Sequence, residues 1–167
     1  MALSLIQLFE NKNPTYPSVY RELINEVSTF GGDSRSEEKR NRQAKAFSNG
    51  YEVFMYAAML GLNRDEPMPT EGMAKERFNV YIKDWKPIEM ARFLLMSVMS
   101  KSDIDFLVLE EMTEEDVKDK ITDLTNLLEQ YACGGFNIMK SAMTGNPDYY
   151  REEDFFLKLL MNHHLRQ

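Results

Sequence analysis

The chain has 167 residues, about the length of one domain, and 43% of them are hydrophobic and 28% charged. This composition is that of an ordinary globular protein and excludes a disordered chain. Twenty-seven acidic and twenty basic residues give a net charge of −7. That charge argues against a protein that binds DNA tightly without regard to sequence, because such a protein needs a basic surface.

The first half of the chain is predicted to be helical, because apolar residues recur at helical spacing. A first helix is predicted over residues 17–30 and ends at Gly31-Gly32. A long helix follows over residues 35–61, with a bend near Asn49-Gly50, since a glycine inside a helix is unfavourable and indicates close packing. Residues 63–72, which contain two prolines, form the clearest loop.

The second half continues the helical pattern after the stretch 78–82, which fits either a helical turn or a short strand. Pro87 begins a helix that extends to Val98, since proline is favourable in the first helical turn. Ser102 and Asp105 are expected to cap a short helix that ends at about Met112.

The last helices are predicted from Thr113, which stands three residues before Asp116 as in a helix cap. This helix is expected to end at Gly134-Gly135, because glycine is the usual residue after a helix, and a short helix follows over residues 136–143. Asn146-Pro147 begins the final helix, whose buried stripe consists of Phe155, Phe156, Leu159 and Leu160.

The predicted fold class is all-α: a single compact domain of six to eight helices that covers residues 1–167. Within it, segment 51–62 is apolar nearly all round, so Phe54 and Ala58 are expected to be fully buried. Six of the twelve methionines stand at helical spacings beside core residues, and they form either the core or an adaptable groove for a partner helix. They are Met55, Met59, Met96, Met99, Met139 and Met143.

The sequence predicts a soluble protein of the cytoplasm. Its longest uncharged apolar stretch, residues 53–62, is half as long as the roughly 20 residues that a membrane helix needs. The first ten residues lack the basic start of a secretory signal. Cys133 is the only cysteine, which excludes an internal disulfide and suits a reducing compartment.

No pattern of catalytic residues is present. The only histidines, His163-His164, are adjacent, and adjacent helical positions point about 100° apart, so the two cannot readily share a metal ion. The sequence also lacks a nucleophile elbow and a glycine-rich phosphate loop. We therefore predict no catalytic residue, no cofactor and no metal site. An enzyme with a carboxylate-bound metal ion remains one alternative.

A basic cluster lies in residues 35–45, which carry a net charge of +3. Arg35, Lys39 and Arg42 share one face of the predicted helix and are candidates for contact with nucleic acid or with an acidic partner. Three phosphate contacts give only a weak, sequence-independent interaction. A solvated helix face is the alternative.

An acidic cluster lies in residues 110–123, which carry a net charge of −5. Its carboxylates lack apolar neighbours on their own face, which is unlike carboxylates tuned for acid–base catalysis. Glu111, Glu115 and Asp119 form a candidate partner-facing acidic face, and a plain solvated surface is again the alternative.

Two blocks of the sequence resemble a known family. The apolar block Tyr51–Leu62, which precedes the polar run Asn63–Pro67, resembles a helix of small Dnd-system-associated proteins. Tyr131-Ala-Cys-Gly-Gly-Phe136 is similar to the second recurring block of that family. The resemblance implies a cellular setting in bacterial DNA phosphorothioation, restriction or anti-phage defence. It implies no catalytic residues.

Our leading hypothesis is therefore a non-enzymatic helical subunit that binds other proteins of a bacterial DNA-modification or defence system. The main alternative is an acidic inhibitor that mimics DNA, as the charge of −7 has the right sign. The twenty basic residues dilute that charge, so a true mimic would need rows of carboxylates spaced like phosphates on its surface.

Overall fold

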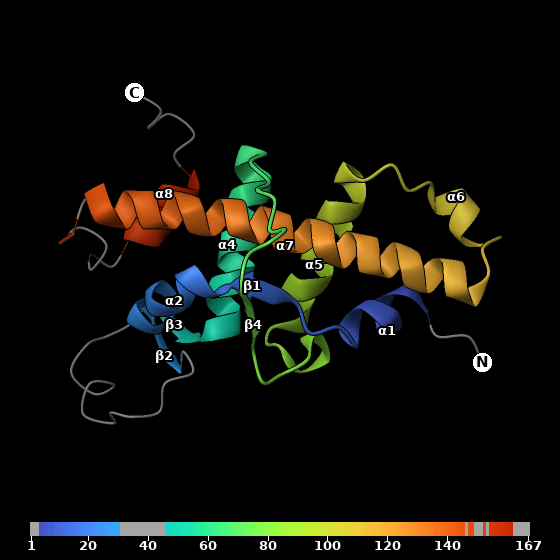
Figure 1. Cartoon of the computed structure of the whole chain (residues 1–167), viewed down its shortest axis with the longest axis horizontal. Coiled ribbons are helices and arrows are strands. Elements are labelled where there is room, and N and C mark those ends of the chain that lie inside the picture. The colour runs from blue at the N-terminus through green and yellow to red at the C-terminus, as the bar shows by residue number, and fades with distance from the viewer. Residues whose placement is uncertain (1–3, 31–45, 146, 149–151, 153, 162–167) are drawn as a thin grey trace.

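The computed structural model describes residues 4–30, 46–145, 147–148, 152 and 154–161 (Figure 1). The all-α prediction is confirmed, because seven α-helices dominate this part of the chain. They are α1 (Leu5–Glu10), α2 (Arg21–Val27), α4 (Gly50–Arg64), α5 (Ile88–Lys101), α6 (Phe106–Leu109), α7 (Glu114–Gly145) and α8 (Phe155–Met161).

Four strands of three residues each, which the sequence analysis did not predict, form two small sheets. Strand β1 (Thr15–Pro17) pairs antiparallel with β4 (Lys75–Arg77), and β2 (Ser28–Phe30) pairs in parallel with β3 (Phe47–Asn49). Two 3₁₀ turns, η1 (Ser18–Tyr20) and η2 (Ile82–Asp84), complete the described elements.

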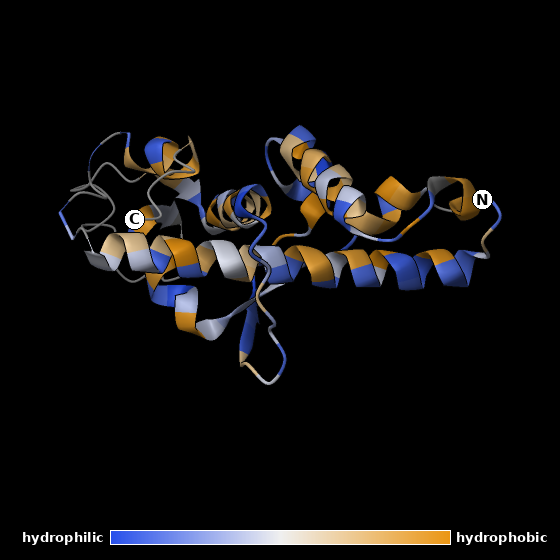
Figure 2. Cartoon of the chain, turned by 90° about the horizontal axis from the view of Figure 1, so that it is seen from above, coloured by the Kyte–Doolittle hydropathy of each residue, from blue (hydrophilic) through white to orange (hydrophobic). Residues whose placement is uncertain are grey.

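Helix α7 determines the shape of the molecule, because it runs along the long axis (Figure 1). Figure 2 shows α4 and α5 on one side of α7 and the β1–β4 pair on the other. The largest interface between two elements joins α4 and α7. Among the described helices, none is both long and apolar enough to cross a membrane.

The centre of α7 is packed unusually closely. A Cβ atom on Gly135 would lie 1.7 Å from the carbonyl oxygen of Ala57 in α4, and one on Gly134 would lie 1.6 Å from the carbonyl oxygen of Glu66. A Cβ atom on Gly61 of α4 would likewise lie 1.9 Å from the carbonyl oxygen of Tyr131. Only glycine leaves room for these approaches.

The prediction that Gly134-Gly135 ends a helix is therefore wrong, and residues 136–143 are not a separate helix. Both glycines lie inside the continuous helix α7, where they admit the backbone of α4 and of the segment that follows it. The amide of Met68 in that segment also donates to the carbonyl oxygen of Gln130 at 2.9 Å.

Two long predicted helices are shorter in the structure. The helix predicted over 17–30 is confirmed only at α2, because Pro17 belongs to β1 and residues 28–30 form β2. Of the helix predicted over 35–61, residues 35–45 lie outside the described residues. Residues 47–49 pair with β2 as strand β3, and the helix is confirmed from Gly50 and continues to Arg64. Gly50 is thus the first residue of a helix and not a bend.

Other boundaries agree better with the prediction. Pro87 directly precedes α5, and the side chain of Asp105 caps α6 by accepting from the amide of Leu107 at 2.9 Å. Ser102 instead follows the last residue of α5, so its predicted cap on α6 is wrong. The ambiguous stretch 78–82 is largely irregular and reaches η2 only at its last residue. The final helix begins at Phe155, later than predicted, because residues 147–148 form a turn.

The core lies around the crossing of α4 and α7. Phe54 and Ala58 are fully buried, as predicted. The ring of Phe54 packs edge-on against Trp85 and against Phe136 of α7, with centroids 5.7 and 6.3 Å away. Four of the six methionines belong to the core (Met55, Met99, Met139 and Met143), Met59 is half-buried and Met96 is exposed.

Candidate interaction surface

Helix α6 and the start of α7 lie at the right-hand end of the molecule in Figure 1, and the sequence of this part is strongly acidic. We call residues 103–123 the acidic segment. It contains nine carboxylates and two lysines, a net charge of −7 that equals the charge of the whole chain. The other 146 residues carry 18 acidic and 18 basic side chains and are therefore neutral as a set.

Only two of the three residues of the predicted acidic face lie on one side of α7. Glu115 and Asp119 are exposed one helical turn apart on α7, and Asp123 is exposed one turn further on. Four-residue steps give a rise of about 6 Å between successive carboxylates. Glu111 is also exposed but lies in the turn before the helix. On a neighbouring row of α7, Lys118 forms an ion pair with Glu114 at 3.1 Å.

The start of α7 is fixed by a local cap that the sequence predicted. The hydroxyl of Thr113 accepts from the amide of Asp116 at 3.2 Å and donates to the carboxylate of Asp116 at 2.6 Å. The acidic residues of the first turn also interact favourably with the positive end of the helix dipole.

Two apolar side chains of α6 are exposed beside these carboxylates. Leu107 is 78% exposed and Val108 is 44% exposed, whereas Leu109 on the same short helix packs against the core. Helix α6 therefore has one seated side and one open apolar side.

Helix α5 also has two large apolar side chains in solvent. Phe93 is 58% exposed and Met96 is 57% exposed, three residues apart on the side away from the core. The sequence predicts Met96 in either the core or a groove for a partner helix, and it does not single out Phe93. The exposure of both side chains could have been predicted from helical periodicity. Leu94, Leu95 and Val98 lie on the buried face of α5, and positions 93 and 96 fall outside that face.

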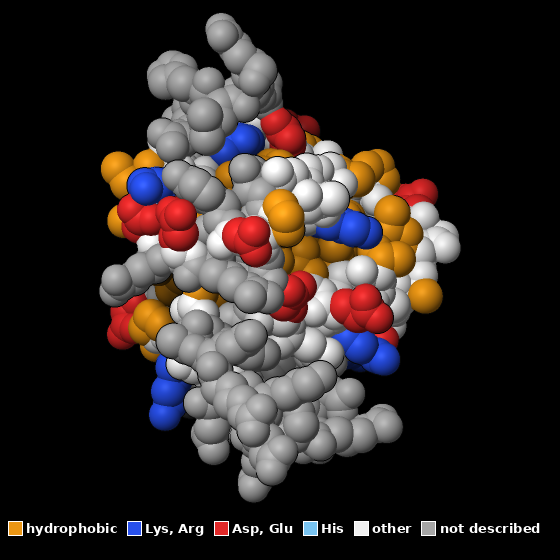
Figure 3. Space-filling model, turned by 90° about the vertical axis from the view of Figure 1, so that its left-hand side faces the viewer, with side chains coloured by type: hydrophobic (Ala, Val, Ile, Leu, Met, Phe, Trp, Pro, Cys, Tyr) orange, Lys and Arg blue, Asp and Glu red, His pale blue; other side chains and the backbone are white. Residues whose placement is uncertain are grey.

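The predicted basic contacts Arg35, Lys39 and Arg42 lie outside the described residues, as do His163 and His164. Figure 3 shows the end of the molecule opposite the acidic segment. There, acidic side chains are scattered among basic and apolar ones.

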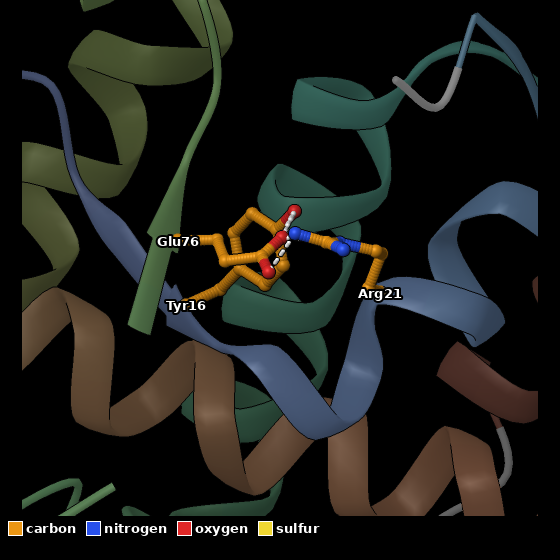
Figure 4. A network of polar contacts seen from close by, with 3 residues as sticks. All are labelled: Tyr16, Arg21 and Glu76. Carbon is orange, nitrogen blue, oxygen red and sulfur yellow. Dashed lines mark hydrogen bonds and ion pairs between the residues drawn. The ribbon is translucent and has the colours of Figure 1, made fainter. Parts of the chain in front are cut away.

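A polar network joins β1, β4 and α2 (Figure 4). The carboxylate of Glu76 accepts from the hydroxyl of Tyr16 at 3.1 Å and from the Nε of Arg21 at 2.6 Å, and it forms a second contact with the Arg21 guanidinium. Burial and the neighbouring Glu76 carboxylate raise the pKa of Tyr16 to about 12. This network fastens the β1–β4 pair to the first turn of α2.

A second polar network joins the end of α4 to α5 and α7. The carboxylate of Asp65 accepts from Lys101 and from the hydroxyl of Tyr131, both at 3.0 Å. These two donors hold the pKa of Asp65 below its ordinary value. Asp65 itself ends α4 in the left-handed conformation, with a φ of 52°.

Tyr20 and Cys133 form a buried pair between η1 and α7. Burial and the neighbouring thiol raise the pKa of Tyr20 to about 12, and burial also raises the pKa of the Cys133 thiol. Both groups therefore stay protonated at neutral pH, which does not suit a nucleophile or a general base.

We expect the stability of the fold to decrease between pH 10 and pH 12. The pKa of Tyr16 and Tyr20 is about 12 in the folded chain and about 10 in the unfolded chain. Because the folded pKa is raised, the stabilisation is complete below pH 10 and is lost as the pH rises through 12. Denaturant melts across this range measure it.

Ultraviolet absorbance of tyrosinate provides the matching titration. In the folded protein Tyr16→Phe should remove one tyrosine that ionises near pH 12, while the same titration in denaturant should lose one near pH 10. Ionisation of every tyrosine near pH 10 in the still-folded protein would contradict the prediction.

A hollow of about 270 Å³ lies between α1 and the start of α7. Leu8 and Ile121 contribute apolar side chains to it, and Asn11, Lys12 and Lys118 contribute polar ones. Within the described ranges, no group of three or more His, Cys, Asp or Glu side chains is placed to hold a metal ion.

The sequence profile of one protein family matches residues 36–166, which is 131 of the 167 residues. The family is described as DNA sulphur modification system-associated protein 4. The chain belongs to this family. As a member of DNA sulphur modification system-associated protein 4, it is associated with DNA sulphur modification systems. No curated protein and no solved structure matches it.

Family membership confirms the resemblance seen in the two sequence blocks. The structure also shows what these two blocks do in the fold. Residues 51–62 form most of α4, and residues 131–136 form the centre of α7. All six residues of the second block are buried, and the two blocks meet at the close approach of Gly135 to Ala57. In this chain of the DNA sulphur modification system-associated protein 4 family, both blocks therefore build the central helix crossing.

Proposed function

We propose that the chain is a non-enzymatic, protein-binding subunit of a DNA sulphur modification system and acts in bacterial defence in the cytoplasm. The observation that carries the proposal is that α5 and α6, two consecutive helices, each expose two large apolar side chains. Phe93, Met96, Leu107 and Val108 are between 44% and 78% exposed. Exposed apolar side chains with charged neighbours are typical of protein interfaces.

Two further observations support a non-enzymatic role. The residues of the two blocks that resemble the family pack α4 against α7, so their role in this structure is structural. The tyrosines and the cysteine with shifted pKa values are all shifted away from neutral pH, whereas catalytic groups are usually tuned toward it. The single buried Cys133 suits a reducing cytoplasm.

Co-expression with each of the other proteins that one such system encodes tests the proposal. We expect a complex of fixed stoichiometry with one of them, measured by size-exclusion chromatography with light scattering. Elution of the chain alone in every combination would contradict the proposal. Nuclease activity of the purified chain, lost in a carboxylate variant, would favour the enzyme alternative.

One observation favours the DNA-mimic alternative. Glu115, Asp119 and Asp123 form an exposed row with a rise of about 6 Å per step. A mimic would be displaced from its protein target by double-stranded DNA, so a gel-shift competition distinguishes it from an ordinary subunit. Displacement of the parent chain by DNA, together with loss of target binding in Glu115→Gln with Asp119→Asn, would support mimicry.

A further inference from the structure

The open side of α6 presents two neighbouring apolar side chains to solvent. Leu107 is 78% exposed and Val108 is 44% exposed, although their neighbours Ile104 and Leu109 pack against the core. The helix is therefore seated by its inner side chains and presents its outer ones to solvent. Apolar side chains in this arrangement lose contact with water when a partner binds.

Carboxylates flank this apolar side in the sequence. Asp103 and Asp105 precede α6, and Glu110 and Glu111 follow it directly; all four are exposed. The first turns of α7 add Glu114, Glu115, Asp116 and Asp119. With its two lysines counted, the acidic segment carries −7.

The charge decides which occupant fits. A nucleic acid or an anionic membrane surface would be repelled by a net charge of −7. A second copy that docked face to face through the same segment would bring two such charges together. A protein surface that offers lysine and arginine around apolar side chains complements both the charge and the exposed leucine and valine.

We propose that the acidic segment, residues 103–123, is a docking site for a basic amphipathic segment of a second protein. Leu107 and Val108 form its apolar centre, and Glu111, Glu115 and Asp119 belong to its charged rim. This inference rests on the proposed function, because that function requires a protein partner, and it adds the place of contact and the chemistry of the partner.

Variants of the acidic segment test the place of contact on the complex isolated as described above. Leu107→Ser with Val108→Ser should weaken binding by at least about tenfold, since apolar centres dominate interface energies. Glu111→Gln, Glu115→Gln and Asp119→Asn together should slow association by about tenfold and flatten its salt dependence, since rim charges steer association. Calorimetry and surface plasmon resonance measure these effects.

Matched controls separate the site from general effects of charge or exposure. Glu71→Gln with Glu89→Gln removes exposed carboxylates outside the acidic segment, and Val19→Ser removes an exposed apolar side chain from η1. These controls should change the affinity by less than about twofold. A complex that tolerates the acidic-segment variants equally well would overturn the docking site while leaving the proposed function intact.

A synthetic peptide tests the chemistry of the partner independently of any natural complex. An amphipathic peptide of leucine and lysine, titrated into the full chain, should shift backbone NMR signals within residues 103–123. The matched peptide of leucine and glutamate should leave them unchanged. Shifts confined to other residues, equal shifts with both peptides, or concentration-dependent self-association through this segment would overturn the inference.

Discussion

Gly135→Ala is expected to separate α4 from α7 and to destabilise the fold strongly. The new Cβ would lie 1.7 Å from the carbonyl oxygen of Ala57, and the obstacle is helix backbone that no side-chain rotation can move. Overpacked cores typically lose about 1–3 kcal/mol, and a backbone obstacle places this substitution at the top of that range or above it. Thermal and denaturant melts measure the loss.

Gly145→Ala is the matched control for the glycine prediction. It replaces a glycine in the same helix, but nothing lies within 4 Å of the position that its Cβ would take. Because alanine is a better helix former than glycine, stability should stay constant or rise by up to about 1 kcal/mol. Equal melting of the two variants would contradict the close approach of α7 to α4.

Phe54→Ala should destabilise the fold by about 3–5 kcal/mol, because removal of a buried phenylalanine leaves a cavity. The ring of Phe54 is fully buried and packs against Trp85, Phe136 and Phe78. At about 2–4 °C per kcal/mol for a chain of this size, Tm should fall by roughly 6–20 °C. Ala58→Asp should be worse, since it would bury an unpaired charge.

Phe93→Ala is the control for that prediction, because it removes the same side chain from an exposed position on α5. Its effect on stability should remain within about 0.5 kcal/mol. If Phe54→Ala instead melted like the parent protein and lost only its partner, Phe54 would belong to a docking face and not to the core.

The sequence predicts best those features of the helices that depend only on residues nearby in the chain. The caps at Thr113 and Asp105 depend on residues two or three positions away, and both form as expected. The buried face of segment 51–62 follows from its apolar composition alone. These features depend little on the rest of the fold.

Contacts between segments that are far apart in the chain could not be predicted from the sequence. Strand β1 pairs with β4 some 60 residues later, so Tyr16 lies opposite Glu76, and a run of three residues carries no periodicity that could reveal this pairing. Gly134-Gly135 follows the local rule for a helix end, but the carbonyl groups of Ala57 and Glu66 create the need for glycine there.

The sequence predicts the acidic residues of the candidate surface, but it does not predict the exposed apolar side chains beside them. Counting charges along the chain identified Glu111, Glu115 and Asp119. The exposure of Leu107 and Phe93 depends on how α6 and α5 are seated on the core, because apolar residues in helices are by default expected to be buried.

Helix α7 continues without interruption from its acidic end through the glycine crossing to Gly145. At 1.5 Å per residue, its 32 residues span about 48 Å. A protein that docked at the acidic end, as proposed above, would be held at a set distance and angle from the α8 end of the chain. Helix α7 would then act as a rigid spacer, and its length would fix the separation of two neighbours in an assembly.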